Sequence, residues 1–235
     1  MNIISIIPAR GGSKRLPKKN IMDLSGKPLI AYTIGASREC NLIDRTIVST
    51  ENDEIKSVSE KYGAEVIKRP IELAGDASPT IDTVMHVVET LENEGYVPDI
   101  IVLLQPTSPL RDSKDILDAL EMFKTGKFGS VVSAKPSNPL WNFSLEDGKV
   151  KPILGWEFIR KRKQDLPEYY SPNGAIYIIT PKTLRERKAF YFETTGAYIM
   201  PEEKSVDIDT LTDFRIAEAI LQSMKGSPGK DKNHR

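Results

Sequence analysis

The chain has 235 residues, of which 39% are hydrophobic and 28% charged, the composition of a globular protein with enough apolar side chains for a core. Its 33 basic and 33 acidic residues cancel, so no nucleic-acid partner is predicted, and the single cysteine excludes an internal disulfide. No apolar run approaches the ~18 residues of a membrane span and no cleavable leader is legible, so we expect a cytoplasmic protein without a membrane partner.

Short β-rich segments alternate with amphipathic segments along most of the chain. The first strand is predicted at Ile3–Pro8, and the unbroken apolar run Ile100–Leu104 predicts a central strand covered on both faces. The other predicted strands are Thr46–Thr50, Ala64–Lys68, Ser130–Ala134, Ala175–Ile179 and Gly196–Met200. The predicted helices are Pro28–Arg38, Asp53–Tyr62, Pro79–Asn93, Ile116–Phe123 and Leu211–Met224. This alternation predicts an α/β fold with a doubly wound, mostly parallel sheet.

The regular alternation stops at residues 136–172, which are rich in Pro, Trp, Tyr and charge. Gly148 predicts a hairpin turn there. About 37 residues are too few for an independent core, so we interpret this segment as an insertion within a single domain of residues 1–225. The polar residues 226–235 are expected to be a disordered tail.

Residues 9–20, which follow the first strand directly, form a segment that we call the cationic loop. Ligands of doubly wound sheets bind beyond the carboxyl ends of the strands, where this loop lies. Gly11 and Gly12 expose backbone N–H groups and Ser13 adds a hydroxyl. Its cations are Arg10, Lys14, Arg15, Lys18 and Lys19. These groups suit a triphosphate, although the P-loop and dinucleotide patterns are absent; a solvated basic loop is the alternative.

The segment Ser205–Thr210 carries two aspartates in a pattern typical of extended backbone. Alternation predicts Asp207 and Asp209 on one face and Ile208 on the other. Two such carboxylates suit a hard cation such as Mg²⁺. The alternative is that Asp209 and Thr210 cap the last helix.

The loop after Leu104 contains Pro106 and Pro109, which stiffen it and hold Gln105 as a neutral hydrogen-bond partner for a ligand. A local bond from Gln105 to the backbone is the alternative. Arg111 is expected to pair with Asp115 at the start of the next helix.

The run IIPARGGSKRLPKKN at residues 6–20 resembles the nucleotide-binding signature of the acylneuraminate cytidylyltransferases. Further segments agree with that family in the same order: Lys27–Ile30, Ile47–Thr50, Arg69–Pro70, Leu103–Arg111, Pro172–Tyr177 and Ser205–Thr210. The resemblance covers residues 3–224 and implies a Rossmann-like nucleotidyltransferase. It implies an enzyme that joins CTP to a nine-carbon 2-keto sugar acid, of sialic, legionaminic or pseudaminic type, and releases pyrophosphate.

The resemblance also implies the site residues. The metal ligands would be Asp207 and Asp209, holding Mg²⁺ with Mn²⁺ as a possible substitute. Catalytic roles fall to Arg10, Lys19, Gln105 and Asp209. Nucleotide-binding roles fall to Ala9, Arg10, Gly11, Gly12, Ser13, Lys14, Lys19, Asn20, Arg69 and Ser78. Sugar-binding roles fall to Gln105, Arg162, Lys163, Asn173, Tyr177, Phe190 and Tyr191, with core packing as the alternative for Phe190.

A homodimer is implied as well, in which the insertion reaches the second subunit and helps to hold the sugar carboxylate. The family often has R-Q-D-L-P where this chain has Lys163 before Gln-Asp-Leu-Pro, so Arg162 and Lys163 are both candidates for that role. Ser171 stands where some relatives carry arginine, which leaves the identity of the sugar open. Two rival functions remain: a nucleotidyltransferase for another sugar, and a non-catalytic nucleotide-binding regulator on the same fold.

Overall fold

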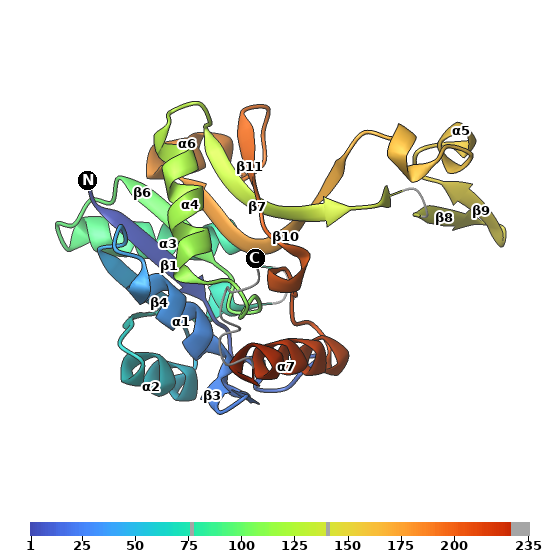
Figure 1. Cartoon of the computed structure of the whole chain (residues 1–235). Helices are drawn as coiled ribbons and strands as arrows, with labels where there is room; N and C mark the ends of the chain where they lie inside the picture. The colour runs from blue at the N-terminus through green and yellow to red at the C-terminus, as the bar shows by residue number, and fades with distance from the viewer. Residues whose placement is uncertain (76–77, 140–141, 227–235) are drawn as a thin grey trace, which may run out of the picture.

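A seven-stranded sheet forms the centre of the computed structural model, which describes residues 1–75, 78–139 and 142–226 (Figure 1). Its strands lie in the order β11-β7-β10-β6-β1-β4-β5. They are β1 (Ile3–Pro8), β4 (Arg45–Thr50), β5 (Glu65–Lys68), β6 (Ile100–Leu104), β7 (Ser130–Ser137), β10 (Tyr169–Ile179) and β11 (Thr195–Ile199). Neighbouring strands are parallel except at β10, which is antiparallel to both β6 and β7. The predicted mostly parallel sheet is confirmed.

Helices cover both faces of the sheet, as a doubly wound fold requires. Ile3 and Ile7 of β1 pack with α1 (Leu29–Glu39), α2 (Asp53–Lys61) and α4 (Ser113–Lys124). Ile4 and Ile6, which point to the other face, pack with α3 (Thr80–Asn93) and α6 (Pro181–Arg187). A third cluster joins Phe214 of α7 (Leu211–Gly226) to the loops beside the carboxyl ends of the strands.

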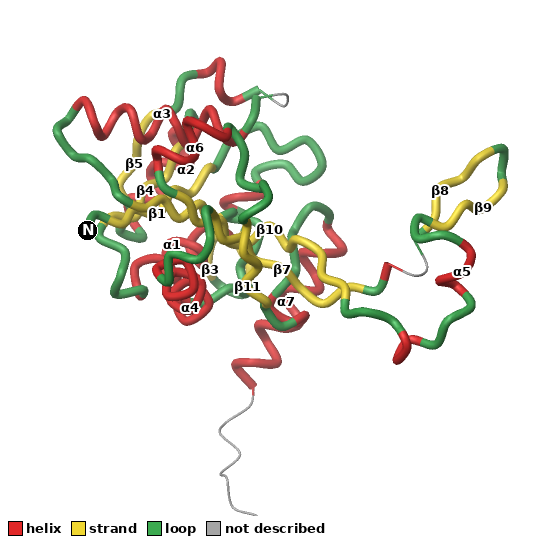
Figure 2. The backbone as a smooth tube through the Cα atoms, turned by 90° about the horizontal axis from the view of Figure 1, so that it is seen from above, coloured by secondary structure: helices red, strands yellow, loops and turns green. Residues whose placement is uncertain are grey.

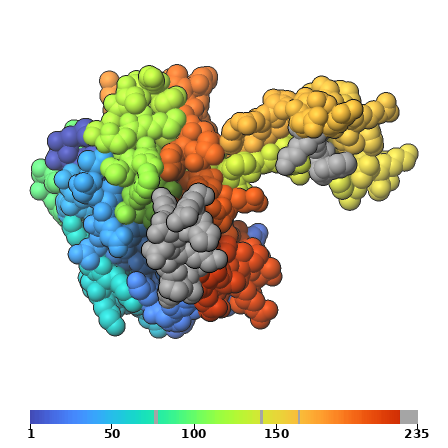
Figure 3. All heavy atoms as spheres, in the orientation of Figure 1, coloured from blue at the N-terminus to red at the C-terminus, as the bar shows by residue number. Residues whose placement is uncertain are grey.

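The described residues of the range 138–168 form an arm that projects from the body of the molecule (Figures 1 and 3). It contains the hairpin of β8 (Phe143–Glu146) and β9 (Lys149–Pro152), the short helix α5 (Trp156–Ile159) and the 3-10 turn η4 (Lys163–Asp165). Asp147 and Gly148 have φ of 50° and 75°, so the turn predicted at Gly148 is confirmed. Figure 2 shows the arm reached through a narrow connection.

That connection is a two-stranded ribbon, so the predicted bounds of the insertion, 136–172, are too wide. Tyr169 lies opposite Ser137, and Pro172 lies opposite Ala134. The ribbon accommodates Pro172 next to an irregularity in register. The arm is therefore carried by the long strands β7 and β10 of the central sheet.

Helix caps explain where sequence prediction of the helices was wrong. α4 begins at Ser113 rather than at Ile116, because Asp112 and Asp115 form a reciprocal capping box. α6 was missed, although Thr180 caps it and Pro181 occupies its first turn. The short elements β2 (Asp23–Leu24), β3 (Lys27–Pro28), η1 (Lys19–Ile21), η2 (Ile71–Ala74) and η5 (Glu202–Lys204) were also missed. Apart from residue 226, the predicted disordered tail lies outside the described residues.

We find no helix in the described ranges with the length and apolar character that crossing a bilayer requires.

Candidate active site

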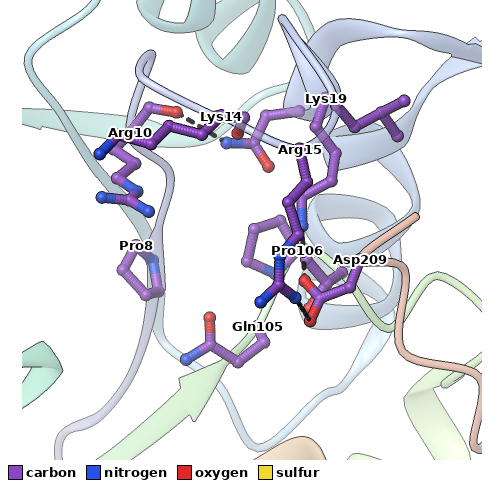
Figure 4. A pocket seen from close by; sticks show the side chains of 12 residues that line it. Pro8, Arg10, Lys14, Arg15, Lys19, Gln105, Pro106 and Asp209 are labelled. Atoms are coloured by element: carbon purple, nitrogen blue, oxygen red, sulfur yellow. Dashed lines mark hydrogen bonds and ion pairs between the residues drawn. The ribbon is translucent and has the colours of Figure 1, made fainter. Parts of the chain in front are cut away.

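A cavity of about 450 Å³ opens beyond the carboxyl ends of β1 and β6, where the fold class places ligands (Figure 4). Three separate parts of the chain meet there: the cationic loop, the loop after β6 and the segment before α7. The lining residues are Pro8, Arg10, Ser13, Lys14, Arg15, Leu16, Lys19, Asn20, Gln105, Pro106, Thr107 and Asp209. Four basic residues and one carboxylate thus face the same space.

Lys19 connects the cationic loop to the segment before α7. Its Nζ donates to the carbonyl oxygen of Ile208 at 2.7 Å and lies 3.2 Å from Asp209 Oδ1. Arg15 lies 3.4 Å from Asp209 Oδ2 and is far more exposed than Lys19, whose side chain is only 13% accessible. The aspartate proposed for metal binding therefore lies among the cations proposed for phosphate binding.

Asp209 does not cap the last helix, which was the alternative role suggested by the sequence. Thr210 Oγ1 accepts from the N–H of Asp213, and the Asp213 carboxylate accepts from the N–H of Thr210 at 2.7 Å. This pair is a capping box at the start of α7. The Asp209 carboxylate accordingly stays available to the cavity.

The alternation predicted for residues 205–209, which we call the carboxylate segment, is confirmed. Ile208 is fully buried and its N–H donates to the carbonyl of Thr107 at 2.9 Å, while Asp207 and Asp209 are exposed. Asp209 lines the cavity of about 450 Å³, and Asp207 lines a neighbouring cavity of about 860 Å³. The two carboxylates therefore stand at the border between two cavities.

The donor set of the carboxylate segment fits Mg²⁺. Partial desolvation and the nearby Asp209 raise the pKa of Asp207, although the Thr107 hydroxyl and Lys19 act in the opposite direction. Within residues 1–75, 78–139 and 142–226, no three His, Cys, Asp or Glu side chains converge as a complete metal cage. Mg²⁺ commonly uses one or two carboxylates and takes its remaining ligands from water and substrate phosphate. A cation bridging this pair would relieve their mutual repulsion.

The cationic loop is held in shape by its own ends and by β4. Asn20 Nδ2 donates to the carbonyl of Arg10 at 3.0 Å, and the N–H of the buried Ala9 donates to the carbonyl of Ser49 at 3.0 Å. Asn20 is buried, so its side chain closes the loop. Gly12 is exposed and has open space around its Cα, which suits close approach of a ligand.

A second cavity of about 220 Å³ adjoins the first and shares Pro8, Arg10 and Gln105 with it. Arg69 and Ser78, both predicted to bind nucleotide, line this second cavity. The Arg69 guanidinium is buried and donates to Ser49 O at 2.7 Å, and burial lowers its pKa. Ser78 Oγ donates to the carbonyl of Glu72 at 3.0 Å.

Gln105 points its side chain into the first cavity, as Figure 4 shows. Its backbone carbonyl accepts from Arg111 at 3.3 Å, so the residue is held by its main chain while its amide faces the ligand space.

Arg111 does not pair with Asp115, and that prediction was wrong. The Asp115 carboxylate instead accepts from Lys204 and from the N–H of Asp112. Arg111 turns inward, is 2% exposed, and donates to Ala175 O at 2.8 Å and to Thr33 Oγ1 at 2.7 Å. Burial lowers its pKa to about 10.

Tyr177 and Asn173 both line the cavity of about 860 Å³. Tyr177 packs against Phe190 and Tyr191 with ring centroids 5.2 and 6.1 Å away, and burial raises its pKa. Phe190 is 8% exposed and belongs to a core cluster, whereas Tyr191 is exposed. The buried Asn173 accepts from Ser133 Oγ at 2.6 Å and donates to Ser205 Oγ at 2.9 Å. Its amide thereby also supports the carboxylate segment.

The two basic residues predicted on the insertion lie on the arm. Arg162 is exposed and lines none of the three cavities described above. The side chain of Lys163 lies outside the part of the chain that the structure describes. Among the described side chains, the single chain therefore does not bring the predicted cation Arg162 to these cavities.

The family model described as cytidylyltransferase matches residues 4–224, which is nearly the whole chain. The chain belongs to the cytidylyltransferase family. Among cytidylyltransferases it is 40% identical, over 94% of its length and 97% of the relative's, to CMP-N,N'-diacetyllegionaminic acid synthase of Legionella pneumophila. It is 31% identical to the pseudaminic acid cytidylyltransferase of Campylobacter jejuni, over 94% of this chain and 97% of that protein.

A third cytidylyltransferase is longer. The chain is 36% identical over 94% of its length to the N-acylneuraminate cytidylyltransferase of Escherichia coli, but it spans only 52% of that relative. Among solved structures, a CMP-2-keto-3-deoxy-manno-octonic acid synthetase complexed with CTP superposes with a TM-score of 0.74 at 16% identity, covering 95% of this chain and 100% of that one. That likeness shows the fold.

Sequence reasoning missed several residues that shape this cytidylyltransferase site. Glu51 bonds to the cationic loop, and Lys204 joins the turn before the carboxylate segment to Asp112 and Asp115 of the α4 capping box. Thr107 holds Ile208 through its backbone. No side chain in the loop after Thr50, which holds Glu51, was singled out from the sequence.

Proposed function

We propose that this chain transfers CMP from CTP to the anomeric hydroxyl of a nine-carbon 2-keto sugar acid, with release of pyrophosphate. One observation carries the proposal: the cationic loop, Gln105 and Asp209 face one cavity, and Lys19 joins the loop to the aspartate. Relatives named for acylneuraminic, legionaminic and pseudaminic acids, all nine-carbon acids of this type, support the choice of acceptor.

The cations provide the binding site for the triphosphate. CTP carries about three to four negative charges near neutral pH, and Arg10, Lys14, Arg15 and Lys19 face the cavity that would receive them. Lys19 is held in place by two acceptors, Ile208 O and Asp209 Oδ1. A preorganised ammonium stabilises charge on the phosphates during transfer without further reorganisation.

The new bond joins the anomeric oxygen of the sugar acid to the α-phosphorus of CTP, and its formation depends on how the two are positioned. The sugar hydroxyl attacks the α-phosphorus, the bond from that phosphorus to the bridging oxygen breaks, and the hydroxyl proton passes to solvent. A hindered hydroxyl is a weak nucleophile, so holding it in line with the phosphate supplies much of the acceleration. Gln105, held rigidly by Arg111, offers a neutral amide for hydrogen bonds to the sugar.

We propose Mg²⁺ as the cofactor, with Mn²⁺ as a possible substitute, held by Asp207 and Asp209. When bound there, the ion neutralises phosphate charge and acidifies the attacking hydroxyl. The position of Asp207 and Asp209 at the border of the cavities of about 450 and 860 Å³ supports this proposal, because the donor set would lie between the space proposed for the triphosphate and that proposed for the acceptor.

The acceptor space is assigned to the cavity of about 860 Å³ lined by Tyr177 and Asp207. We propose that a second copy of the chain completes it through the arm. The arm exposes an unusual set of apolar side chains, namely Phe143, Leu145, Val150, Ile153 and Trp156. It also carries Arg162, a cation suited to the sugar carboxylate. The use of CTP leads us to propose a cytoplasmic location.

Pyrophosphate release tests the function. The chain is incubated with CTP and Mg²⁺ and with one acid at a time: legionaminic, N-acetylneuraminic, pseudaminic or 3-deoxy-manno-octulosonic acid. Release with at least one nine-carbon acid, and less with the eight-carbon acid, is expected. CTP binding without release from any acid would support the non-catalytic regulator, and release with a hexose 1-phosphate would support a different nucleotidyltransferase.

A further inference from the structure

Glu51, which follows β4, contacts the cationic loop at Gly11. Its Oε1 accepts from the backbone N–H of Gly11 at 2.6 Å, a short bond of the kind that a carboxylate makes. Gly11 thus directs its N–H toward the protein, so the expectation that this N–H is exposed for a phosphate was wrong. The contact joins the loop after β1 to the loop after the neighbouring strand.

The loop also lies directly on the next residue, Asn52. A Cβ at Gly11 would be 2.8 Å from Asn52 Nδ2, so only glycine permits this approach. Asn52 is itself fixed, because its side chain accepts from the N–H of Ile55 and caps α2. The cationic loop is therefore seated on the rigid start of a helix.

Glu51 lies among charged side chains as well as against Gly11. Glu51 lies near Arg69 and favours its charged form, whereas burial and the nearby Arg10 disfavour that form. Both arginines line the cavity of about 220 Å³. The second carboxylate oxygen, Oε2, is buried and accepts no hydrogen bond from the described residues. The Glu51 carboxylate therefore meets the cationic loop through Oε1.

We propose that Glu51 is a positioning residue, which through Gly11 holds the cationic loop in the conformation that binds the triphosphate. The inference rests on the proposed function of the loop. A second contact from α2 to the loop provides a comparison: Lys18 and Glu54 lie 2.8 Å apart, but both side chains are more than half exposed. Exposed pairs contribute little, so this second contact should be dispensable.

The test compares Glu51→Ala, Glu51→Gln and the control Glu54→Ala by calorimetric titration with CTP and Mg²⁺ in the absence of any sugar acid. Glu51→Ala should weaken CTP binding by about tenfold, the usual value of one hydrogen bond to a charged group. Glu51→Gln keeps an acceptor oxygen and should stay within about threefold of wild type. Glu54→Ala should bind as wild type does.

A second measurement uses the chain without nucleotide. Hydrogen exchange at the Gly11 amide should be faster in Glu51→Ala and near wild type in Glu51→Gln. If Glu51→Ala does not fold, Glu51→Met, which fills the volume without an acceptor, replaces it. A folded alanine or methionine variant with wild-type CTP affinity would overturn the proposal, whatever its Tm. If the unmutated chain binds CTP but shows no turnover with any sugar acid, only the proposed function is refuted.

Discussion

Lys19 Nζ lies within hydrogen-bond distance of both Ile208 O and Asp209 Oδ1, across 190 residues of sequence. This contact closes the cavity between the cationic loop and the carboxylate segment. The local sequence of neither segment requires this contact. It forms because the fold brings the loop after β1 and the segment before α7 to the same edge of the sheet. The pairing is the structural reason to treat the two segments as one site.

Lys19→Ala should lose roughly 2–4 kcal/mol of transition-state stabilisation, measured as a lower kcat/KM for CTP. This is the loss expected when a preorganised cation is removed from developing charge. Lys18→Ala is the matched control, because Lys18 is the neighbouring residue and, within the described part of the chain, its ion pair is the exposed one with Glu54. Steady-state kinetics of pyrophosphate release measure both variants. Equal kcat/KM for the two would remove Lys19 from the site.

Asp209→Ala should abolish turnover and leave stability nearly unchanged, because the capping role belongs to Asp213. Asp213→Ala should behave in the opposite way. It should lose about 1 kcal/mol of unfolding free energy with the capping box, and it should keep its turnover in assays at temperatures well below its Tm. Assays at saturating Mg²⁺ and urea denaturation separate the two effects. Near wild-type turnover of Asp209→Ala would rule out the metal assignment.

Arg111→Lys should reduce the free energy of unfolding by about 1–3 kcal/mol, because the single nitrogen of an ammonium replaces the two guanidinium nitrogens, Nη1 and Nη2, that donate to Ala175 O, Gln105 O and Thr33 Oγ1. The control is Arg38→Lys, since Arg38 is exposed and donates only to Tyr62 O among the described residues. Its effect should stay within about 0.5 kcal/mol. Equal urea midpoints for both variants would show that the buried guanidinium is not needed to hold the loop after β6.

The fold was predictable because its signals are local and repeated. Apolar runs such as Ile100–Leu104 and the spacing within α3 required no knowledge of tertiary contacts, and every predicted strand of the central sheet was found. The errors occurred where a few polar atoms decide the outcome. Asp112 and Asp115 start α4 one turn early, and the ribbon of β7 and β10 continues past prolines.

The site was predictable to the extent that its residues follow strands directly. Gln105 and the cationic loop lie at carboxyl ends, where the fold class places ligands. Glu51 was not singled out, because its importance depends on the backbone N–H that it meets. Arg111 was assigned the wrong partner, since spacing along a helix says nothing of burial against α1 and β10.

Stability should fall as the pH rises above about 10, where unfolded tyrosines ionise. Burial and the carboxylates of Asp115 and Asp118 raise the pKa of Tyr198. The folded chain therefore keeps a proton that the unfolded chain loses, and the free energy of unfolding decreases as the pH rises through this range. Tyr198→Phe should flatten that decrease when urea midpoints at pH 9 and pH 11 are compared. An unchanged slope would contradict the assignment.

The dimer proposal predicts that charge on the apolar face of the arm separates two subunits. Leu145→Glu combined with Ile153→Glu places two carboxylates on exposed apolar positions that contribute little to the core. Light scattering after gel filtration should show a dimer for the wild type and a monomer for the double variant. The KM for the sugar acid should rise, because the partner's arm no longer reaches the acceptor cavity. A monomeric wild type would contradict the proposed assembly.

The central claim is that CMP is transferred to the sugar acid itself, and ³¹P NMR of one reaction tests it most directly. The chain is mixed with CTP, Mg²⁺ and N,N'-diacetyllegionaminic acid, with N-acetylneuraminic and pseudaminic acids in parallel tubes and Asp209→Ala as the inactive control. The predicted result is one new phosphodiester signal that grows together with the signal of pyrophosphate. A spectrum that keeps only the signals of CTP with all three acids, or that shows a nucleoside diphosphate sugar, would contradict the account.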